Sequence, residues 1–254
     1  MLSIIFPSLP YQRLIDPMWQ EEMDVARSGG HSVCLFDAEQ EKLYQQPNPQ
    51  QPSLYRGWML SATEYQKLAN MTPLLVSSDR YLASHQASGW YDSIMGFTPQ
   101  SSILTAETAE AAVESFIRQA GRCFVKGLSK SFGPESVISA LPELAALLEK
   151  HDIAPQDSLF VREFVALSSK PEQRFFVVRN EAFGAAGTQF PEMLKPALEA
   201  LKSRWFYTVD VAYTQTGQPV IIEVGDGQVS DIKEWRVAEL YSSVIFRLSE
   251  LATA

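Results

Sequence analysis

Two carboxylates lie within segments of the sequence that otherwise have the composition of buried strands. Asp210 belongs to TVDVAY and Glu223 belongs to PVIIEV, with a turn at Thr216 and Gly217 between the two segments. A hairpin made of these segments would bring both carboxylates near each other on one face. Because the two negative charges repel, the pair requires a cation, and Mg²⁺ takes one or two carboxylates together with phosphate oxygens and water. The alternative is that each carboxylate pairs with a separate arginine or lysine.

A lysine followed by small residues is a second feature that could do chemistry. Lys126 ends an apolar segment, and the run GLSKSFG follows it as far as Gly133. Backbone N–H groups of such a loop can turn toward an anion, which suits the segment to phosphate binding. The pattern differs from the P-loop motif GxxxxGK followed by Ser or Thr, so that fold class is disfavoured. Taken alone, lysines such as Lys126 and Lys130 are more often solvated surface charges.

Charged and apolar residues alternate along two more segments, VREFV at 161–165 and EQRFF at 172–176. Such alternation predicts strands with one polar and one apolar face. Arg174 could make planar, bidentate contacts with a phosphate, which a lysine cannot make. The alternative is a cross-strand ion pair between an arginine and a glutamate.

The N-terminal third of the chain alternates between strand and helix patterns. The apolar segment 2–6, a helical stretch at 16–26 and the apolar run 32–36 together predict a βαβ unit. Ser61 and Glu64 have the spacing of a capping box, which predicts a helix start between strands at 54–60 and 72–77. We therefore expect a small α/β lobe with a mostly parallel sheet.

Two further lobes are expected after this one. An amphipathic helix pattern starts at Thr105 and ends at Gly121, because glycine suits the left-handed end of a helix. Segments rich in Phe and Val around residues 123–127 and 158–167 predict strands. Two hairpins, the second of which carries the acidic pair, and a C-terminal helix over residues 232–251 complete the third lobe.

Composition and charge exclude several classes of protein. A chain of 254 residues with 46% hydrophobic and 20% charged residues is neither disordered nor collagen-like. A formal net charge of -9 disfavours nucleic acid and anionic membranes as partners unless basic residues cluster locally. No segment approaches the roughly 18 to 20 consecutive apolar residues of a membrane span, so we expect a cytoplasmic protein.

The cysteines and histidines do not form a recognisable site in the sequence. Cys34 and Cys123 lie in apolar runs without CxxC spacing, which predicts two reduced, buried thiols. His31, His85 and His151 are far apart in the chain, so we interpret each as structural.

In combination and in order, these motifs resemble the ATP-grasp superfamily. Its ordered elements are a lysine on a strand, a small-residue phosphate loop, a hinge strand, a Glu-x-Arg strand and a final hairpin carrying Asp and Glu. No single motif is specific to this superfamily. Their joint occurrence over about residues 100–230 is specific to it. The segment YRGWML at 55–60 is also similar to a clade of bacterial and phage-associated ATP-grasp proteins named for two arginines and one lysine.

The resemblance implies an α/β protein with the ATP-grasp fold, in which a Rossmann-like pre-ATP-grasp lobe (1–90) precedes the ATP-grasp N-terminal lobe (91–165) and C-terminal lobe (166–254). ATP would lie between the last two lobes, with adenine at the hinge, ribose at Glu172 and Mg²⁺ at the acidic pair. Family members usually carry Glu-x-Asn at the last metal position, whereas this sequence reads EVGD, so Asp226 is expected to replace the asparagine. The implied nucleotide contacts are Lys126, Ser131, Phe132, Gly133, Glu163, Phe164, Val165, Glu172 and Arg174, and the implied metal ligands are Asp210, Glu223 and Asp226.

The expected reaction is attack by a substrate carboxylate on the γ-phosphate, followed by capture of the acyl phosphate by an amine or a thiol, on a peptide or a small molecule. Arg174 and Lys130 would act on the phosphates. Arg56 is the candidate for the carboxylate site, with packing on Trp58 or Tyr55 as the alternative. Phosphoryl transfer without ligation, or a nucleotide-binding module without catalysis, would use the same residues. The sequence leaves the substrates and the oligomeric state open.

Overall fold

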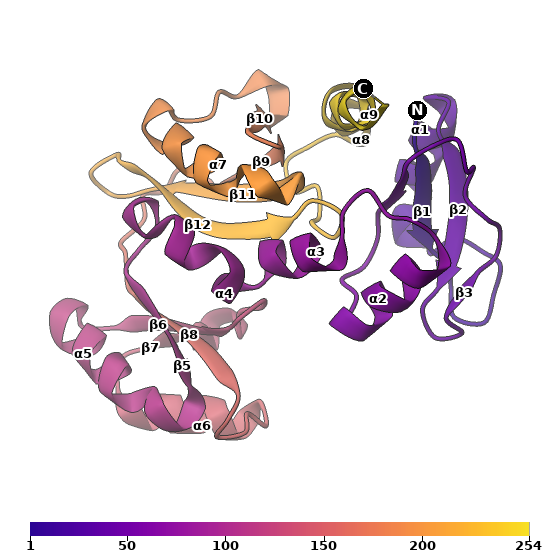
Figure 1. The fold of residues 1–254 in the computed structure, drawn as a ribbon. Helices are drawn as coiled ribbons and strands as arrows, with labels where there is room; N and C mark the ends of the chain where they lie inside the picture. The colour runs from indigo at the N-terminus through magenta and orange to yellow at the C-terminus, as the bar shows by residue number, and fades with distance from the viewer. Residues whose placement is uncertain (254) are drawn as a thin grey trace.

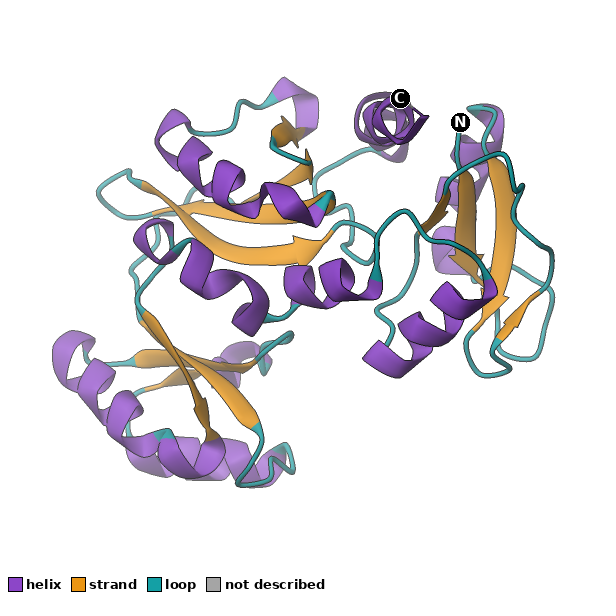
Figure 2. Ribbon diagram, in the orientation of Figure 1, coloured by secondary structure: helices purple, strands orange, loops and turns teal. Residues whose placement is uncertain are grey.

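The computed structural model describes residues 1–253 and has three lobes, each built on a four-stranded sheet (Figure 1). Helices cover the sheets, so the mixed α/β class is confirmed (Figure 2). Each sheet falls within one of the three segments expected from the sequence, while the domain boundaries stay a prediction.

The first lobe has a central strand with parallel neighbours on both sides. Its elements are β1 (Ser3–Pro7), α1 (Gln20–Ser28), β2 (Ser32–Asp37), β3 (Lys42–Leu43), β4 (Ser53–Tyr55) and α2 (Ala62–Met71). β1 pairs in parallel with β2 and β4, and β3 pairs antiparallel with β2. The expected βαβ unit is therefore confirmed, whereas the Rossmann-like classification of the lobe stays a prediction.

The capping box is present, but the strands around it are shorter than expected. The Ser61 side chain accepts a hydrogen bond from the Glu64 N–H at 3.2 Å, and the Glu64 carboxylate accepts one from the Ser61 N–H at 2.7 Å. β4 ends at Tyr55, and the segment expected as a strand at 72–77 makes only an isolated bridge between Ser53 and Leu74. Its second residue is a proline, which has no N–H to donate to a ladder.

The second lobe is an antiparallel sheet with two helices. It contains β5 (Ser101–Thr105), α5 (Glu110–Ala120), β6 (Cys123–Gly127), β7 (Val137–Ile138), α6 (Leu141–Lys150) and β8 (Ser158–Glu163). The strand order is β5-β8-β6-β7. Gly121 ends α5 in the left-handed conformation at φ 74°, as its position in the sequence predicts. Cys123, Leu144 and Val161 belong to a core that this lobe does not share with the other two.

The third lobe carries both expected hairpins in one antiparallel sheet. Its elements are β9 (Gln173–Val178), β10 (Glu181–Gly184), α7 (Lys195–Leu201), β11 (Phe206–Tyr213) and β12 (Pro219–Asp226). The strand order is β10-β9-β11-β12, so β12 lies at an edge of the sheet. Asp210 and Glu223 are directly opposite each other in the register of β11 and β12. The hairpin expected to carry the two carboxylates is thus confirmed.

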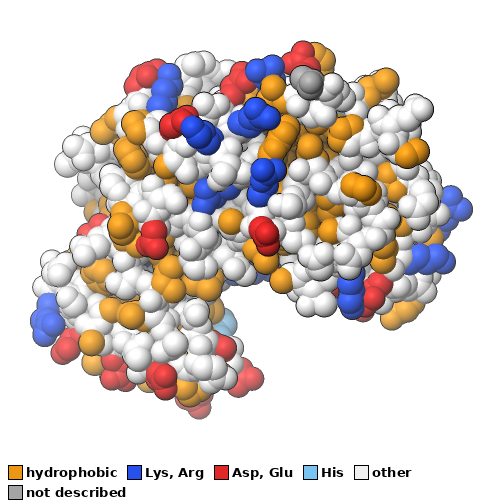
Figure 3. Space-filling view, viewed as in Figure 1, with side chains coloured by type: hydrophobic (Ala, Val, Ile, Leu, Met, Phe, Trp, Pro, Cys, Tyr) orange, Lys and Arg blue, Asp and Glu red, His pale blue; other side chains and the backbone are white. Residues whose placement is uncertain are grey.

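Two helices between the first and second lobes pack against the third. These are α3 (Ser78–His85) and α4 (Ala87–Trp90), and Figure 1 shows both running along the β9–β12 sheet. Trp90 and Tyr91 share a core with residues of β9, β11 and α7. In the space-filling view, a notch lies between the second lobe and the rest of the molecule (Figure 3).

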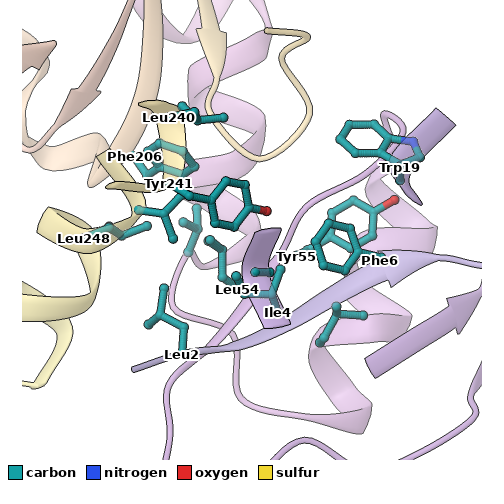
Figure 4. Close-up of a cluster of buried hydrophobic side chains, with 14 of the residues drawn as sticks. Leu2, Ile4, Phe6, Trp19, Leu54, Tyr55, Phe206, Leu240, Tyr241 and Leu248 are labelled. Atoms are coloured by element: carbon teal, nitrogen blue, oxygen red, sulfur yellow. The ribbon is translucent and has the colours of Figure 1, made fainter. Parts of the chain in front are cut away.

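The C-terminal segment returns to the first lobe. α8 (Val237–Leu240), a π-helical turn (Tyr241–Ile245) and α9 (Phe246–Thr253) replace the continuous helix expected at 232–251. The helix begins later than expected because residues 231–235 bind the third-lobe sheet through Asp231, Glu234 and Trp235. Figure 4 shows side chains from β1 and β4 packing against others from β11 and the C-terminal helices. The first and third lobes therefore share one core.

The remaining helical elements are short turns. They are 3-10 segments at Pro17–Trp19, Tyr91–Ser93, Met95–Phe97, Ala106–Thr108, Gly133–Ser136, Ala185–Gly187, Glu192–Leu194 and Lys202–Arg204. Within residues 1–253, no helix has the length and apolar character needed to cross a bilayer.

Candidate active site

A cleft of about 730 Å³ lies between the second and third lobes. One wall comes from β6, the loop after it and the end of β8, and the other comes from β12. The expected nucleotide and phosphate residues that line this cleft are Lys126, Lys130, Ser131, Glu163, Phe164, Val165 and Glu172, and Glu223 joins them from the acidic pair.

The phosphate-loop lysine spans the cleft. Lys126 is 5% exposed, and its Nζ lies 2.5 Å from the Glu223 Oε1 on the opposite sheet. The loop after it is a tight hairpin, in which the Gly127 N–H donates to the Lys130 carbonyl at 3.0 Å and Lys126 bridges Ser131. Phe132 and Gly133 do not line the cleft, because Phe132 turns away and packs against His151 with ring centroids 4.7 Å apart.

The hinge leaves backbone groups available at the cleft. β8 ends at Glu163, whose N–H donates to the Gln100 carbonyl at 2.9 Å. Within residues 1–253, the backbone groups of Phe164 and Val165 make no hydrogen bond to the protein. Adenine needs such unpaired backbone donors and acceptors, so the geometry suits the role expected of this segment.

Arg162 also joins the two lobes, a role that the sequence reasoning did not assign to it. Its Nη1 donates to the Ile222 carbonyl on β12 at 2.6 Å, and its Nε donates to the Ser101 Oγ at 3.2 Å. Burial lowers the pKa of Arg162 to about 10, against an opposing effect of Glu223. The guanidinium stays cationic near neutral pH and adds positive charge to the cleft wall.

Asp210, the other carboxylate of the acidic pair, contacts two cationic side chains. The Arg174 Nε and Nη2 contact the two Asp210 oxygens at 2.8 and 2.7 Å. The Lys233 Nζ lies 3.0 Å from the Asp210 Oδ2 and also pairs with Glu172. Burial raises the pKa of the Asp210 carboxyl, but Arg174 and Lys233 outweigh that effect and hold the pKa below its usual value. In Glu172, by contrast, burial outweighs Lys233, so the pKa is raised.

The acidic pair therefore shows the alternative considered from the sequence, in which each carboxylate contacts separate cations. Within residues 1–253, no three His, Cys, Asp or Glu side chains are grouped closely enough to hold a metal ion alone. Two carboxylates on one sheet face still fit Mg²⁺ that arrives with a nucleotide, because phosphate oxygens and water supply its other ligands. Asp210 and Glu223 are the residues that would hold it.

Asp226 does not join this pair, contrary to the expected set of three carboxylates. Side chains three positions apart on a strand point to opposite faces, so Asp226 is not on the sheet face that carries Asp210 and Glu223, although Asp226 and Glu223 both line a smaller pocket at this edge of the sheet. The carboxyl is fully buried, and its Oδ1 accepts hydrogen bonds from the Gln228 N–H at 2.9 Å and Nε2 at 3.1 Å. Burial raises the pKa of Asp226 to about 7.

Arg56 lies outside the cleft and has no exposed surface. It forms a bidentate pair with Glu22, with both contacts at 2.8 Å, and its Nη1 donates to the Ser230 carbonyl at 2.5 Å. Its guanidinium lies 5.0 Å from the centroid of the Trp19 ring. The structure therefore favours the packing alternative, although the aromatic partner is neither Trp58 nor Tyr55.

A smaller pocket of about 190 Å³ adjoins the cleft. It shares Ser129 and Glu223 with the cleft, and Arg174 lines it instead of the larger cavity. His85 and Asp231 also line this pocket. Neither residue was singled out as functional from the sequence, because their positions depend on how α3 and the loop after β12 pack.

Comparison with known proteins identifies the family. The matching family model describes an ATP-grasp domain, family 3 of the clade named for two arginines and one lysine. It covers residues 72–244, which is more than half of the chain. No curated protein sequence matches.

Solved structures agree with the fold. The D-cycloserine synthetase DcsG has a TM-score of 0.68 at 12% identity, covering 97% of this chain and 99% of that chain. The ATP-grasp ligase PsnB, complexed with minimal precursor, Mg and ADP, has a TM-score of 0.62 at 12% identity, with 97% of each chain covered. D-alanyl-alanine synthetase A from Vibrio cholerae has a TM-score of 0.60 at 12% identity, with 99% of each chain covered. The chain belongs to the ATP-grasp proteins, in family 3 of the clade named for two arginines and one lysine.

Proposed function

We propose that this protein is an ATP- and Mg²⁺-dependent ligase that joins a carboxylate to an amine or a thiol through an acyl phosphate. The observation that carries the proposal is the cleft between two antiparallel sheets, where Lys126, the unpaired hinge backbone and Glu223 meet. Family membership supports ATP binding, and the names of the similar structures, which include a synthetase and a ligase complexed with a precursor peptide, favour ligation.

In this proposal, the chemistry of the cleft walls orients the nucleotide. The base lies against Phe164 and Val165, and the ribose hydroxyls lie at Glu172. The phosphates lie between Lys126, Lys130 and the loop that joins them. Backbone N–H groups and lysine side chains together stabilise phosphate charge.

Contacts with a charged ligand can replace the ion pairs that the cleft contains without one. Lys126 exchanges Glu223 for a phosphate oxygen, and Glu223 becomes available with Asp210 for the cation that accompanies ATP. A divalent cation held there by Asp210 and Glu223 would neutralise the charge that develops on the transferred phosphoryl group. Because each charge changes partner, little net desolvation is needed.

Two group transfers follow. A carboxylate oxygen of the substrate bonds to the γ-phosphorus while the bond to ADP breaks, with Lys130 and Arg174 on the phosphoryl oxygens. The amine nitrogen or thiol sulfur then bonds to the acyl carbon, inorganic phosphate leaves, and the nucleophile loses a proton. Most of the rate enhancement comes from positioning the reactants.

The test is the melting temperature with ATP, with Mg²⁺ and with both. At a ligand concentration about 100-fold above Kd, stabilisation of about 2.7 kcal/mol is expected, or a rise of roughly 5 to 10 °C for a protein of this size. We expect Lys126→Met and Glu223→Gln to reduce this rise. Lys67→Ala is the control, because Lys67 is an exposed lysine paired with Glu41 outside the cleft.

Product analysis separates ligation from the alternatives. ADP release that requires both a carboxylate and a nucleophile supports the ligase. A stable phosphorylated product formed without a nucleophile indicates phosphoryl transfer alone, and binding without turnover indicates a noncatalytic module. The absence of any nucleotide-dependent change in melting temperature would refute the proposal.

A further inference from the structure

Two residues that line the smaller pocket beside the cleft each have a buried polar atom without a hydrogen-bond partner among residues 1–253. These atoms are the Asp226 Oδ2 and the His85 Nδ1, and both residues line the pocket. Buried polar groups in folded proteins are almost always paired, and an unpaired one is costly. Two such atoms at one pocket therefore indicate a ligand.

The two carboxylate oxygens of Asp226 differ in their hydrogen bonding. Gln228 donates to Oδ1 through its N–H and its side chain, which fixes the carboxyl group in place. In the part of the chain that the structure describes, Oδ2 has no hydrogen-bond partner although the residue is fully buried. A hydrogen-bond donor, above all a cationic one, would satisfy this oxygen.

His85 offers a neutral ring. The residue is 8% exposed on α3, and its ring centroid lies 4.4 Å from that of Tyr81. Burial lowers the pKa of His85, and the Tyr81 backbone one helical turn earlier opposes that effect without making a hydrogen bond of good geometry to Nδ1. A neutral imidazole has one nitrogen that accepts a hydrogen bond. His85 and Asp226 can therefore both accept hydrogen bonds from one donor group.

The charges of the pocket favour a cation over an anion. The charged side chains that line it are Arg174, Glu223, Asp226 and Asp231, three acids against one base. Arg174 is paired with Asp210 and Asp231, and Glu223 with Lys126, so Asp226 is the one charged group of this lining that has no ionic partner within residues 1–253. At ~30 Å³ per water molecule, the volume of about 190 Å³ holds roughly six waters, enough for an amino group and a few carbons.

We propose that this pocket binds the primary amino group of the acceptor substrate, which donates hydrogen bonds to the Asp226 carboxylate and the His85 ring. This assignment rests on the proposed ligase function. It specifies that the nucleophile of the ligation is an amine and not a thiol. Ser129 and Glu223 form the wall common to both cavities, so an amine held here lies beside the expected site of phosphoryl transfer.

The experiment follows the histidine rings by NMR while ethylammonium is added, with and without ADP and Mg²⁺. The chain has three histidines, so the His85 signals can be assigned by substitution. We expect the His85 signals to shift saturably and those of His31 and His151 to stay in place. Ethanol, which has similar size and no charge, is expected to leave all three unchanged.

Matched variants test the carboxylate. Asp226→Asn keeps an acceptor for Gln228 and removes the charge, and we expect it to weaken ethylammonium binding by about tenfold or more. Asp79→Asn, an exposed aspartate on the same helix as His85, is expected to bind as the wild type does. Equal binding by Asp226→Asn, or shifts of equal size at all three histidines, would overturn the assignment.

The two proposals fail in different ways. If ADP and Mg²⁺ raise the melting temperature but ethylammonium does not shift the His85 signals, the amine pocket is wrong and the nucleotide site stands. If the His85 signals respond to ethylammonium while nucleotide has no effect on stability, the ligase proposal is wrong.

Discussion

The carboxylates at the site differ in how their charges are balanced. Asp210 is buried but contacts both Arg174 and Lys233, whereas the carboxyl of the equally buried Asp226 is hydrogen-bonded, within residues 1–253, to Gln228 alone. A buried charge without an ionic partner shifts its pKa toward the neutral form. The two aspartates, on opposite faces of one hairpin, are therefore expected to affect stability in opposite ways as the pH changes.

Asp226 is expected to reduce stability at alkaline pH. Its pKa is raised from 3.8 to about 7 in the folded protein, so the folded state binds the proton more tightly than the unfolded state. The free energy of unfolding should then fall as pH rises from about 4 to about 7 and stay constant above that, by up to about 4 kcal/mol at 1.36 kcal/mol per pKa unit. Asp226→Asn removes this loss.

Urea unfolding at pH 5 and pH 8 measures the effect. The asparagine variant should gain more stability over the wild type at pH 8 than at pH 5. Asp79→Asn, whose carboxylate is exposed, should follow the wild type at both values. Parallel stability curves for wild type and Asp226→Asn would show that the carboxyl is not perturbed by burial.

At the scale of elements, the end of α5 depends on backbone conformation alone. Gly121 has φ +74°, and a Cβ added there would meet no atom within 4 Å. Gly121→Ala should therefore destabilise the second lobe by about 1 to 2 kcal/mol, purely through the left-handed conformation. Gly96→Ala is a matched control, because Gly96 also has open space around it but no left-handed φ.

Thermal unfolding compares the two glycine variants. Gly96→Ala is expected to be neutral or to stabilise by up to about 1 kcal/mol, since alanine reduces the entropy of the unfolded chain. Equal destabilisation by both substitutions would mean that the left-handed conformation of Gly121 does not determine the cost.

Local patterns predicted the elements whose residues lie close in sequence. The acidic hairpin, the end of α5 and the capping box at Ser61 each depend on a few neighbouring residues, and each is present. Lys233, Arg162 and His85 could not be placed this way, because their neighbours come from distant segments. Lys233 was assigned to a helix, yet it lies in the irregular segment before Val237, where it binds Asp210 and Glu172.

At the scale of the whole molecule, the first and the second lobe are joined to the third lobe in different ways. The first and third lobes have a continuous apolar core in which Leu2 and Leu54 pack with Leu248. The second lobe contacts the third across the cleft mainly through polar groups, such as Lys126 with Glu223 and Arg162 with Ile222, and adds the side chain of Phe160 to the third lobe's core. Apolar cores couple lobes strongly, whereas a polar, solvent-lined contact allows relative movement.

Core substitutions should therefore unfold different parts of the molecule. Leu248→Ala removes a fully buried side chain from the shared core and should cost about 2 to 5 kcal/mol. Native-state hydrogen exchange should then accelerate in β1 and β11 together, because both strands depend on that core. Leu144→Ala, in the separate core of the second lobe, should accelerate exchange in β6 and β8 instead.

Leu14→Ala controls for the loss of a leucine at a site that is 58% exposed, and should change stability by less than about 0.5 kcal/mol. If Leu248→Ala accelerated exchange equally in all three sheets, the molecule would unfold as one unit. The second lobe could then not move independently over a bound nucleotide. Acceleration confined to the first and third lobes would instead identify them as one cooperative unit, relative to which the β5–β8 lobe is free to move.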